Sequence, residues 1–255
     1  VTSTSVSIYN ERQKALVKLY KDLEKDELFE IGTGDEILNV YFALYAAEDL
    51  TAADGTIIPK DGLIEIAGVQ ADGTLTFSAD LPIGSYYVKE YSTNEHYLIS
   101  EESYPVVFEY GGEDTAVVEI VVNNGDAILN EIIRGSISGI KVDENGEPLP
   151  GAVFGLFKAD CTEFTKENAI LTAESAEDGS FSFTEVPYGI WQIKEISTVD
   201  GYVLSDEIFE VQIDEDGQVI ELGNIENKPI TGELEITKKD ISDGKLLPNA
   251  GFRIK

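Results

Sequence analysis

The sequence is poor in the residues on which many catalytic and metal sites depend. Its 255 residues include no methionine, one cysteine and one histidine. The single Cys161 excludes an internal disulfide, and because no histidine lies near it in the sequence we expect an inert loop thiol. The lone His96 argues against a zinc site and against a Ser-His-Asp triad. The absence of methionine leads us to expect a fragment or a processed chain.

Positive charge is also scarce. Eighteen Lys and Arg residues stand against 49 Asp and Glu residues, which gives a net charge of −31. Such a chain repels phosphate backbones and anionic lipid, so we expect neither nucleic acid nor a membrane surface as a partner. No apolar run reaches the length of about 18 residues that a membrane span requires, so none is predicted in this fragment. The 42% of apolar residues suffices for one or two buried cores.

Three acidic turn sequences, "DENGE", "AEDGS" and "DEDGQ", contain residue types that could bind calcium. Each is too short for a complete calcium-binding loop. Their Asn-Gly and Asp-Gly pairs are typical of tight hairpin turns. We therefore predict hairpins at these places, and we predict no metal and no cofactor.

Short runs of alternating apolar and polar residues separate such turns, for example "GTLTFSADL", "SYYVKEY" and "GSFSFTEV". This pattern predicts an all-β protein. The stretch 10–30 is rich in Lys and Glu and would tolerate a helix. Val17, Leu19 and Lys21 nevertheless alternate as in a strand with one inward face. We prefer the strand, because the internal repeat requires it.

Internal repeats define the organisation of the chain. The string "GSISGIKVDENGEPLPGAVFGLF" returns as "GELEITKKDISDGKLLPNAGFRI", which places Lys141 opposite Lys238, and a weaker copy aligns Lys21. An asparagine precedes each of these lysines by eleven residues: 21 − 10, 141 − 130 and 238 − 227. We predict the last strand of a preceding repeat in 1–12, complete repeats in 13–133 and 134–231, and the first strands of a truncated repeat in 232–255.

A glutamate recurs at one place in both complete repeats. It ends "PIGSYYVKE" as Glu90 and "PYGIWQIKE" as Glu195. Alternation puts Glu195 on the same face as Trp191 and Ile193, which is the apolar and inward face. A lone buried carboxylate costs several kcal/mol unless it has a partner. Each repeat therefore needs a polar partner for its glutamate.

The candidate partners are the lysine and the asparagine of the same repeat, which gives two sets: Lys21, Glu90 and Asn130, and Lys141, Glu195 and Asn227. Desolvation lowers the pKa of a lysine and raises that of a glutamate, so both can become neutral. A neutral amine is a nucleophile that could attack the asparagine amide and expel ammonia. We expect the protonated glutamate to hydrogen-bond to the amide oxygen and then to shuttle protons.

These motifs give the chain a resemblance to the prealbumin-like B-type repeats (Cna B-type or SpaA-like) of Gram-positive collagen adhesins and pilins. "IKVD", "PYGIWQIKE" and "ENKP" carry it in the second repeat, and "LYKD", "PIGSYYVKE" and "LNEI" carry it more loosely in the first. The resemblance implies tandem Ig-like β-sandwiches in which the first-strand lysine and last-strand asparagine form an isopeptide bond, aided by the glutamate. Asn10 and Lys238 are the equivalents at the truncated ends, and we expect them to remain uncrosslinked.

Several alternatives stay open. Lys18 and Lys25 compete with Lys21 as the reactive amine of the first repeat. The three polar residues could also form a hydrogen-bonded cluster without a covalent bond, which would only fix strand register. Tyr86 and Trp191 are predicted to be core anchors rather than a platform for sugars.

We expect from this a structural stalk of a surface adhesin or pilus-type protein, extracellular and anchored to the cell wall of a Gram-positive bacterium. It would be no enzyme, apart from the autocatalytic bond. Its partners would be the neighbouring repeats and, through a distal domain, a host surface or matrix protein. The alternative is an adhesin module that binds host protein or glycan through its loops, in the insertion 47–72 or around Cys161. A polymerising pilin shaft lacks a convincing lysine motif here, because "YPVV" is a poor match.

Overall fold

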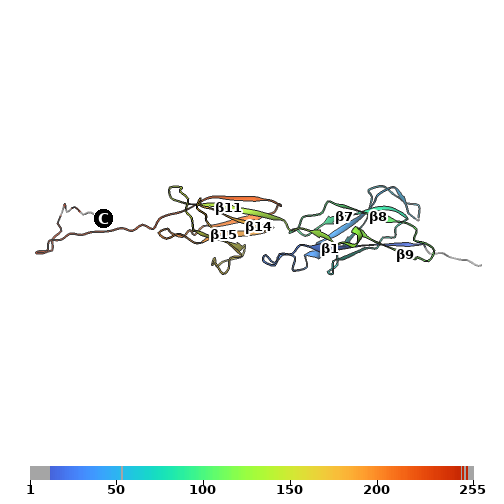
Figure 1. Cartoon of the computed structure of the whole chain (residues 1–255), viewed down its shortest axis with the longest axis horizontal. Coiled ribbons are helices and arrows are strands. Elements are labelled where there is room, and N and C mark those ends of the chain that lie inside the picture. The colour runs from blue at the N-terminus through green and yellow to red at the C-terminus, as the bar shows by residue number, and fades with distance from the viewer. Residues whose placement is uncertain (1–11, 53, 248, 250, 252–255) are drawn as a thin grey trace, which may run out of the picture.

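The structure is a computed structural model that describes residues 12–52, 54–247, 249 and 251. Two β-sandwiches follow one another along an elongated molecule (Figure 1). The all-β, tandem-sandwich prediction is confirmed. We call the sandwich built from β1 to β10 repeat one, and the sandwich built from β11 to β17 repeat two.

Repeat one consists of two sheets. The first has the order β10-β1-β6, with β9 also paired to β1, and the second has the order β5-β2-β7-β8. The strands are β1 (Lys14–Leu23), β2 (Tyr41–Ala46), β5 (Leu63–Gly68), β6 (Thr74–Phe77), β7 (Gly84–Ser92), β8 (Ser103–Phe108), β9 (Val117–Val121) and β10 (Ile128–Asn130). Two short 3₁₀ helices, η1 (Glu36–Asn39) and η2 (Val122–Gly125), interrupt the connections.

Repeat two has the same arrangement with fewer strands. Its sheets are ordered β14-β11-β17 and β13-β12-β15-β16. The strands are β11 (Arg134–Asp143), β12 (Val153–Lys158), β13 (Leu171–Glu174), β14 (Ser180–Pro187), β15 (Gly189–Ser197), β16 (Ile208–Ile213) and β17 (Val219–Asn227). The single strand β17 takes the place that β9 and β10 share in repeat one, because both repeats pair their first and last strands in parallel.

Within the stretch 10–30, for which a helix was the alternative, Lys14–Leu23 form strand β1. Val17, Leu19, Lys21 and Leu23 are all buried along it, while the residues between them are more exposed. Alternation with period two puts one face of a strand into the core, so the packing decides against the helical propensity of the Lys and Glu residues.

Gly139 breaks this alternation in repeat two for a packing reason. It pairs with Phe181 across β11 and β14, and a Cβ atom added to it would lie 2.7 Å from the Phe181 ring. That ring stacks on Phe154 at 3.8 Å between centroids. Repeat one has Leu19 opposite Leu75 at the same register. In repeat two, the Phe181 ring alone therefore occupies the space that two leucine side chains occupy in repeat one.

Tyr86 and Trp191 have the same role in the two cores. Both are buried, with 1% and 6% of their surface exposed. The Tyr86 hydroxyl donates a hydrogen bond to the Pro82 carbonyl, and the Trp191 Nε1 donates one to the Pro187 carbonyl. The prediction that both are core anchors is confirmed.

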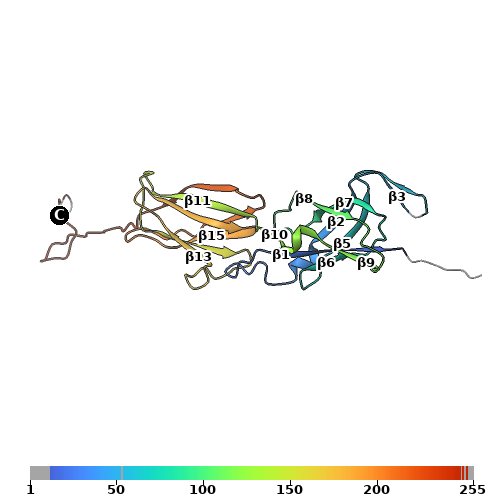
Figure 2. The same cartoon turned by 45° about the vertical axis from the view of Figure 1, so that its right-hand side comes forward.

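The main difference between the repeats is the inserted hairpin of β3 (Leu50–Thr51) and β4 (Ile57–Ile58) in repeat one. It projects at the end of the molecule far from repeat two (Figure 2). The hairpin prediction is confirmed for "DENGE", where Asp143 accepts hydrogen bonds from the amides of Asn145 and Glu147 and a bridge pairs Val142 with Pro148. It is wrong for "AEDGS" and "DEDGQ", because these turns join β13 to β14 and β16 to β17, which lie in different sheets.

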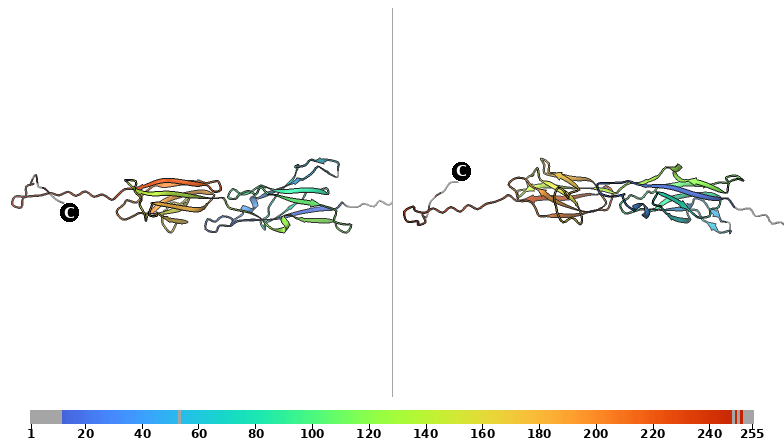
Figure 3. Two further views of the ribbon diagram at one scale, coloured as in Figure 1. Left: turned by 45° about the horizontal axis from the view of Figure 1, so that its top comes forward. Right: turned by 90° about the horizontal axis from the view of Figure 1, so that it is seen from below.

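The two repeats meet through ionic and aromatic contacts, among them a Lys158–Glu30 ion pair and the edge-on rings of His96 and Tyr188. Arg134, the first residue of β11, lies 3.0 Å from the carboxylate of Glu24 and 3.1 Å from that of Asp26, both in repeat one. Phe29 of repeat one packs edge-on against Trp191 of repeat two, with ring centroids 5.2 Å apart. The views in Figure 3 show the repeats end to end along one axis.

The chain continues beyond β17 as an extended segment away from repeat two (Figure 1). An isolated bridge joins Lys239 to Leu246, and the Leu247 amide donates to the Lys238 carbonyl at 3.0 Å. The Leu149 amide donates in the same way to the Lys141 carbonyl at 2.9 Å. The turn after the lysine thus has the same hydrogen bond in both copies.

Candidate polar cross-link site

Strand register brings the lysine and asparagine of each repeat together. In repeat two, Lys141 pairs with Ile225, and Asn227 lies two positions further along β17. In repeat one, Lys21 pairs with Ile128, and Asn130 lies two positions further along β10. Residues two positions apart on a strand share a face, and diagonal neighbours on adjacent strands are within reach of a long side chain.

Both lysines are buried, Lys141 completely and Lys21 with 4% of its surface exposed. The Lys141 Nζ donates a hydrogen bond to the Ile225 carbonyl at 3.0 Å, and the Lys21 Nζ donates one to the Ile128 carbonyl at 2.8 Å. Each amine is therefore held against the strand that carries the asparagine, by the carbonyl two residues before it.

The glutamates come from the opposite sheet. Glu195 on β15 pairs with Phe154 of β12, and Glu90 on β7 pairs with Phe42 of β2. Glu195 is 1% exposed and lies with its Oε1 3.8 Å from the Lys141 Nζ. Each site therefore lies between the two sheets and forms only when the sandwich closes.

The asparagine amide points its nitrogen at the glutamate. Asn227 Nδ2 donates to Glu195 Oε1 at 2.8 Å and to Oε2 at 2.9 Å, and Asn130 Nδ2 donates to Glu90 Oε1 at 2.7 Å. Our expectation that the glutamate contacts the amide oxygen differs from this geometry. A carboxylate oxygen accepts hydrogen bonds and an amide N–H donates them, so the amide nitrogen faces the glutamate. Within the described residues, Oδ1 of both asparagines has no hydrogen-bond partner.

Each glutamate is also held by a backbone amide that the sequence analysis missed. The Ser100 amide donates to Glu90 Oε2 at 2.7 Å, and the Ser205 amide donates to Glu195 Oε2 at 3.0 Å. A sequence signal existed: "EYSTNEHYLIS" and "EISTVDGYVLS" share a glutamate, a Ser-Thr pair, a tyrosine and a final serine at equal spacing. The loop after the glutamate therefore folds back over it in both repeats.

Burial shifts the pKa of Lys21, Glu90 and Lys141. It lowers the pKa of Lys21 to about 8, although the nearby Glu90 carboxylate opposes the shift. Burial raises the pKa of Glu90, against the hydrogen bonds that its carboxylate accepts. Burial also lowers the pKa of Lys141, against the Glu195 charge. At a given pH, the neutral amine form is thus more populated at both lysines than in a solvated lysine.

The other sequence candidates are placed differently. Lys25 is exposed, and Lys18 is only half-buried, with its Nζ 4.9 Å from the centroid of the Tyr20 ring. Lys238 is exposed in the extended C-terminal segment. Asn10 lies outside the described residues. Among the three lysines considered for repeat one, only Lys21 lies beside a buried glutamate and asparagine.

Comparison with known families agrees with this architecture. Residues 29–125 and 135–228 each match the SpaA family, described as a prealbumin-like fold domain. The chain belongs to the SpaA prealbumin-like fold family. The resemblance inferred from the lysine, glutamate and asparagine motifs is therefore confirmed.

Two solved structures resemble the chain over most of its length. The Bacillus anthracis TIE protein is 26% identical with a TM-score of 0.61, and the match covers 91% of this chain and 37% of that one. The C-terminal fragment of the pilus adhesin SpaC from Lactobacillus rhamnosus GG is 14% identical with a TM-score of 0.50, and the match covers 87% of this chain and 100% of that fragment. The second likeness concerns the fold alone. No protein with curated annotation matches by sequence.

The chain thus spans a little over a third of the TIE structure that it matches. The family model describes a fold, and the name pilus adhesin belongs to the SpaC protein. In the part of the chain that the structure describes, no helix has the length and apolar character needed to cross a membrane.

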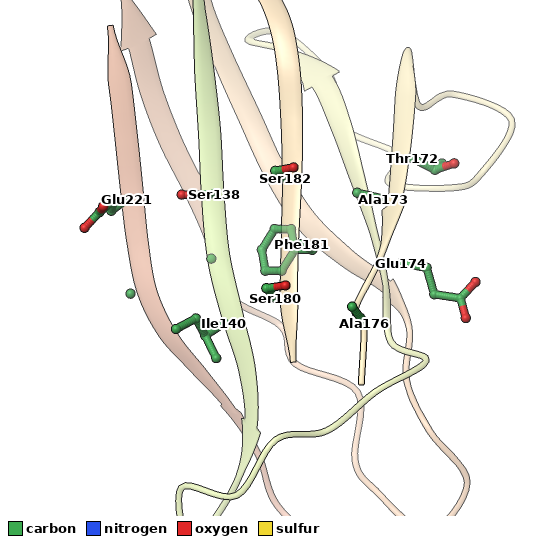
Figure 4. A pocket seen from close by; sticks show the side chains of 12 residues that line it. Ser138, Ile140, Thr172, Ala173, Glu174, Ala176, Ser180, Phe181, Ser182 and Glu221 are labelled. Carbon is green, nitrogen blue, oxygen red and sulfur yellow. The ribbon is translucent and has the colours of Figure 1, made fainter. Parts of the chain in front are cut away.

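A surface groove of about 710 Å³ lies on repeat two, separate from the polar site. Ser180 and Ser182 of β14 lie in the middle of its lining, with Ile140 of β11 and Glu221 of β17 on one side and Ala173 of β13 on the other (Figure 4). No residue of the lysine, glutamate and asparagine set lines this groove. The groove is therefore separate from the candidate cross-link site.

Proposed function

We propose that the chain is a stalk segment in which each repeat forms its own isopeptide bond, Lys21 to Asn130 and Lys141 to Asn227. Glu90 and Glu195 would be the acid-base groups. The observation that supports this best is the repetition of one geometry: a buried lysine, a glutamate from the opposite sheet, and an asparagine two register positions beyond the residue that pairs with the lysine. We also propose 13–133 and 134–231 as the two units.

The reaction is a transamidation. The Lys Nζ forms a bond to Asn Cγ, the bond from Cγ to Nδ2 breaks, and one proton passes from Nζ to Nδ2, so that ammonia leaves. The glutamate accepts hydrogen bonds from Nδ2 and lies near Nζ in repeat two, so it can carry this proton. The fold supplies the proximity that makes an amide reactive toward an amine.

The mechanical consequence follows from strand order. The bond would join the first strand of a repeat to its last strand, so that tension entering along β11 leaves along β17 without passing through the strands between. The Arg134 ion pairs and the contact between Phe29 and Trp191 support a stiff junction between the two links. Two such links in series would form a rod that extends without unfolding.

We place this rod outside the cell, on the wall of a Gram-positive bacterium. Neighbouring repeats are its first partners, and a distal domain would contact a host surface or matrix protein. The loop-binding alternative has less support, because the β3–β4 hairpin and the Cys161 loop belong to different repeats. A polymerised shaft would require an intermolecular lysine that we do not identify.

The deciding experiment is the intact mass of the denatured chain. Each bond releases one ammonia, so two bonds lower the mass by roughly 34 Da in total. We expect that deficit in the unaltered chain and half of it in Glu90→Gln or Glu195→Gln. A chain at its full calculated mass would show that no bond has formed and that the cores hold only hydrogen-bonded polar clusters. This result would contradict the proposed stalk mechanism.

A further inference from the structure

A threonine contacts the asparagine amide nitrogen in both repeats. Asn227 Nδ2 donates a hydrogen bond to Thr198 Oγ1 at 2.6 Å, and Asn130 Nδ2 donates one to Thr93 Oγ1 at 2.9 Å. The same nitrogen donates to the glutamate in each case. The two hydrogens of the amide nitrogen are thus shared between one carboxylate and one hydroxyl.

Both threonines have the same position in the fold. Thr93 directly follows β7 and Thr198 directly follows β15, three residues after the glutamate in each repeat. Strict alternation would turn a residue three positions away to the opposite face. The chain leaves the strand at this point, and this departure lets the glutamate and the threonine face one asparagine.

We propose that Thr93 and Thr198 are catalytic residues of isopeptide formation, which bind the departing amide nitrogen. This inference rests on the proposed cross-link and assigns a third side chain to it. The glutamate and the threonine fix the amide plane, so that Nδ2 points toward the proton source and cannot exchange places with Oδ1.

The hydroxyl contributes most when the C–N bond breaks. Nδ2 gains a proton at that moment and carries positive charge until ammonia leaves. A hydrogen bond from a charged donor is stronger than one from a neutral amide, so the contact with Oγ1 strengthens along the reaction. No additional reactant is needed, because the proton comes from the lysine amine through the glutamate and leaves with the ammonia.

The test follows bond formation during refolding of the full chain. Newly synthesised chain is held unfolded in denaturant and then diluted, and samples are quenched in acid and digested. The branched peptide containing Lys141 and Asn227 is quantified separately from the one containing Lys21 and Asn130. The buried Trp191, the only tryptophan, reports by its fluorescence that repeat two has folded.

Thr198→Val keeps the shape of the side chain and removes the hydroxyl. We expect it to slow the Lys141–Asn227 bond about tenfold, the effect of losing one hydrogen bond in a transition state, and to leave the other bond at its normal rate. Thr198→Ser should restore the rate to within about twofold of the unaltered chain. Ser197→Ala changes the exposed neighbouring hydroxyl and is the matched control. Thr93→Val should slow the Lys21–Asn130 bond and leave the Lys141–Asn227 bond at its normal rate.

The outcomes separate the inference from the proposed function. Equal rates for Thr198→Val and the unaltered chain, or a Thr198→Ser chain as slow as Thr198→Val, would overturn the threonine role while both bonds still form. The lack of any branched peptide in the unaltered chain would overturn the cross-link itself. If the tryptophan fluorescence shows that Thr198→Val does not fold, two other comparisons test the threonine role. The rate of the Lys141–Asn227 bond is compared between Thr198→Ser and Thr198→Ala, and the rate of the Lys21–Asn130 bond is measured in Thr93→Val.

Discussion

Lys141 and Asn227 lie on adjacent parallel strands, with the asparagine two register positions beyond the residue that pairs with the lysine. Glu195 reaches them from the other sheet of the sandwich. A bond between the two would close a loop of 86 residues (227 − 141) and include almost the whole of repeat two. Substitutions at this site or around it should therefore change the unfolding free energy of the repeat, the pH dependence of bond formation and the shape of the molecule.

Blocking the bond should destabilise repeat two. In Glu195→Gln the loop stays open, and the chain-entropy estimate for a loop of this length is a loss of about 4 to 5 kcal/mol in the free energy of unfolding. Urea unfolding followed by Trp191 fluorescence measures it. Glu210→Gln, on an exposed position of β16, is the matched control. An unchanged urea midpoint in Glu195→Gln would contradict a bond in repeat two.

The rate of bond formation in repeat one should be bell-shaped in pH. The reactive state of the Lys21 and Glu90 pair holds one proton, whichever group carries it. Lys21 has a pKa of about 8, so the last proton is lost and the rate falls above that pH. Burial raises the pKa of Glu90 above 4.5, so a second proton binds and the rate falls at acidic pH. Branched-peptide yields across pH during refolding check both limbs. A rate that keeps rising up to the ordinary lysine pKa would contradict this.

The junction should bend more without Arg134. Arg134→Ala removes the contacts to Glu24 and Asp26, and these groups are partly buried, so salt screens them less than surface pairs. We expect a smaller maximum dimension and a broader distance distribution in small-angle X-ray scattering. Arg12→Ala, which removes a surface pair with Asp80 in repeat one, is the control and should leave the scattering unchanged. Identical curves for both variants would contradict a role of the Arg134 ion pairs in holding the junction straight.

The Gly139 and Phe181 pair should be exchangeable for two leucines. Gly139→Leu alone inserts a side chain into the Phe181 ring and should cost about 1 to 3 kcal/mol, and Phe181→Leu alone leaves a void. The double variant recreates the Leu19 and Leu75 arrangement and should recover at least about 1 kcal/mol of the summed loss. Urea unfolding of the four proteins in this cycle measures the coupling. Strict additivity would show that the two positions do not share one space.

Alternation along the strands was enough to predict much of the site. Val17 and Leu19 pointed to an inward Lys21, and Trp191 and Ile193 pointed to an inward Glu195, because period two holds as long as the strand is regular. Alternation is less clean before Lys141, where Gly139 occupies an inward position. The ring that fills this position comes from Phe181 on another strand, and no local pattern contains that information.

The threonines and the amide orientation could not be predicted in this way. Thr93 and Thr198 lie beyond the strand ends, where alternation no longer determines the direction of a side chain. The sequence also does not specify which end of the asparagine amide faces the glutamate, since this depends on the protonation of the carboxylate and on the third partner. Comparing the two repeats residue by residue would have revealed the shared Ser-Thr pair, although not its contact.

The placement of the asparagine in the final strand of each sandwich has a consequence for biosynthesis. A growing chain exposes Lys21 long before Asn130 exists, so the proposed bond in repeat one can close only after that repeat is complete. Lys141 must then wait in the same way for Asn227. The two bonds would therefore form one after another in the order of synthesis, and the presence of each bond would indicate that its own sandwich had folded correctly.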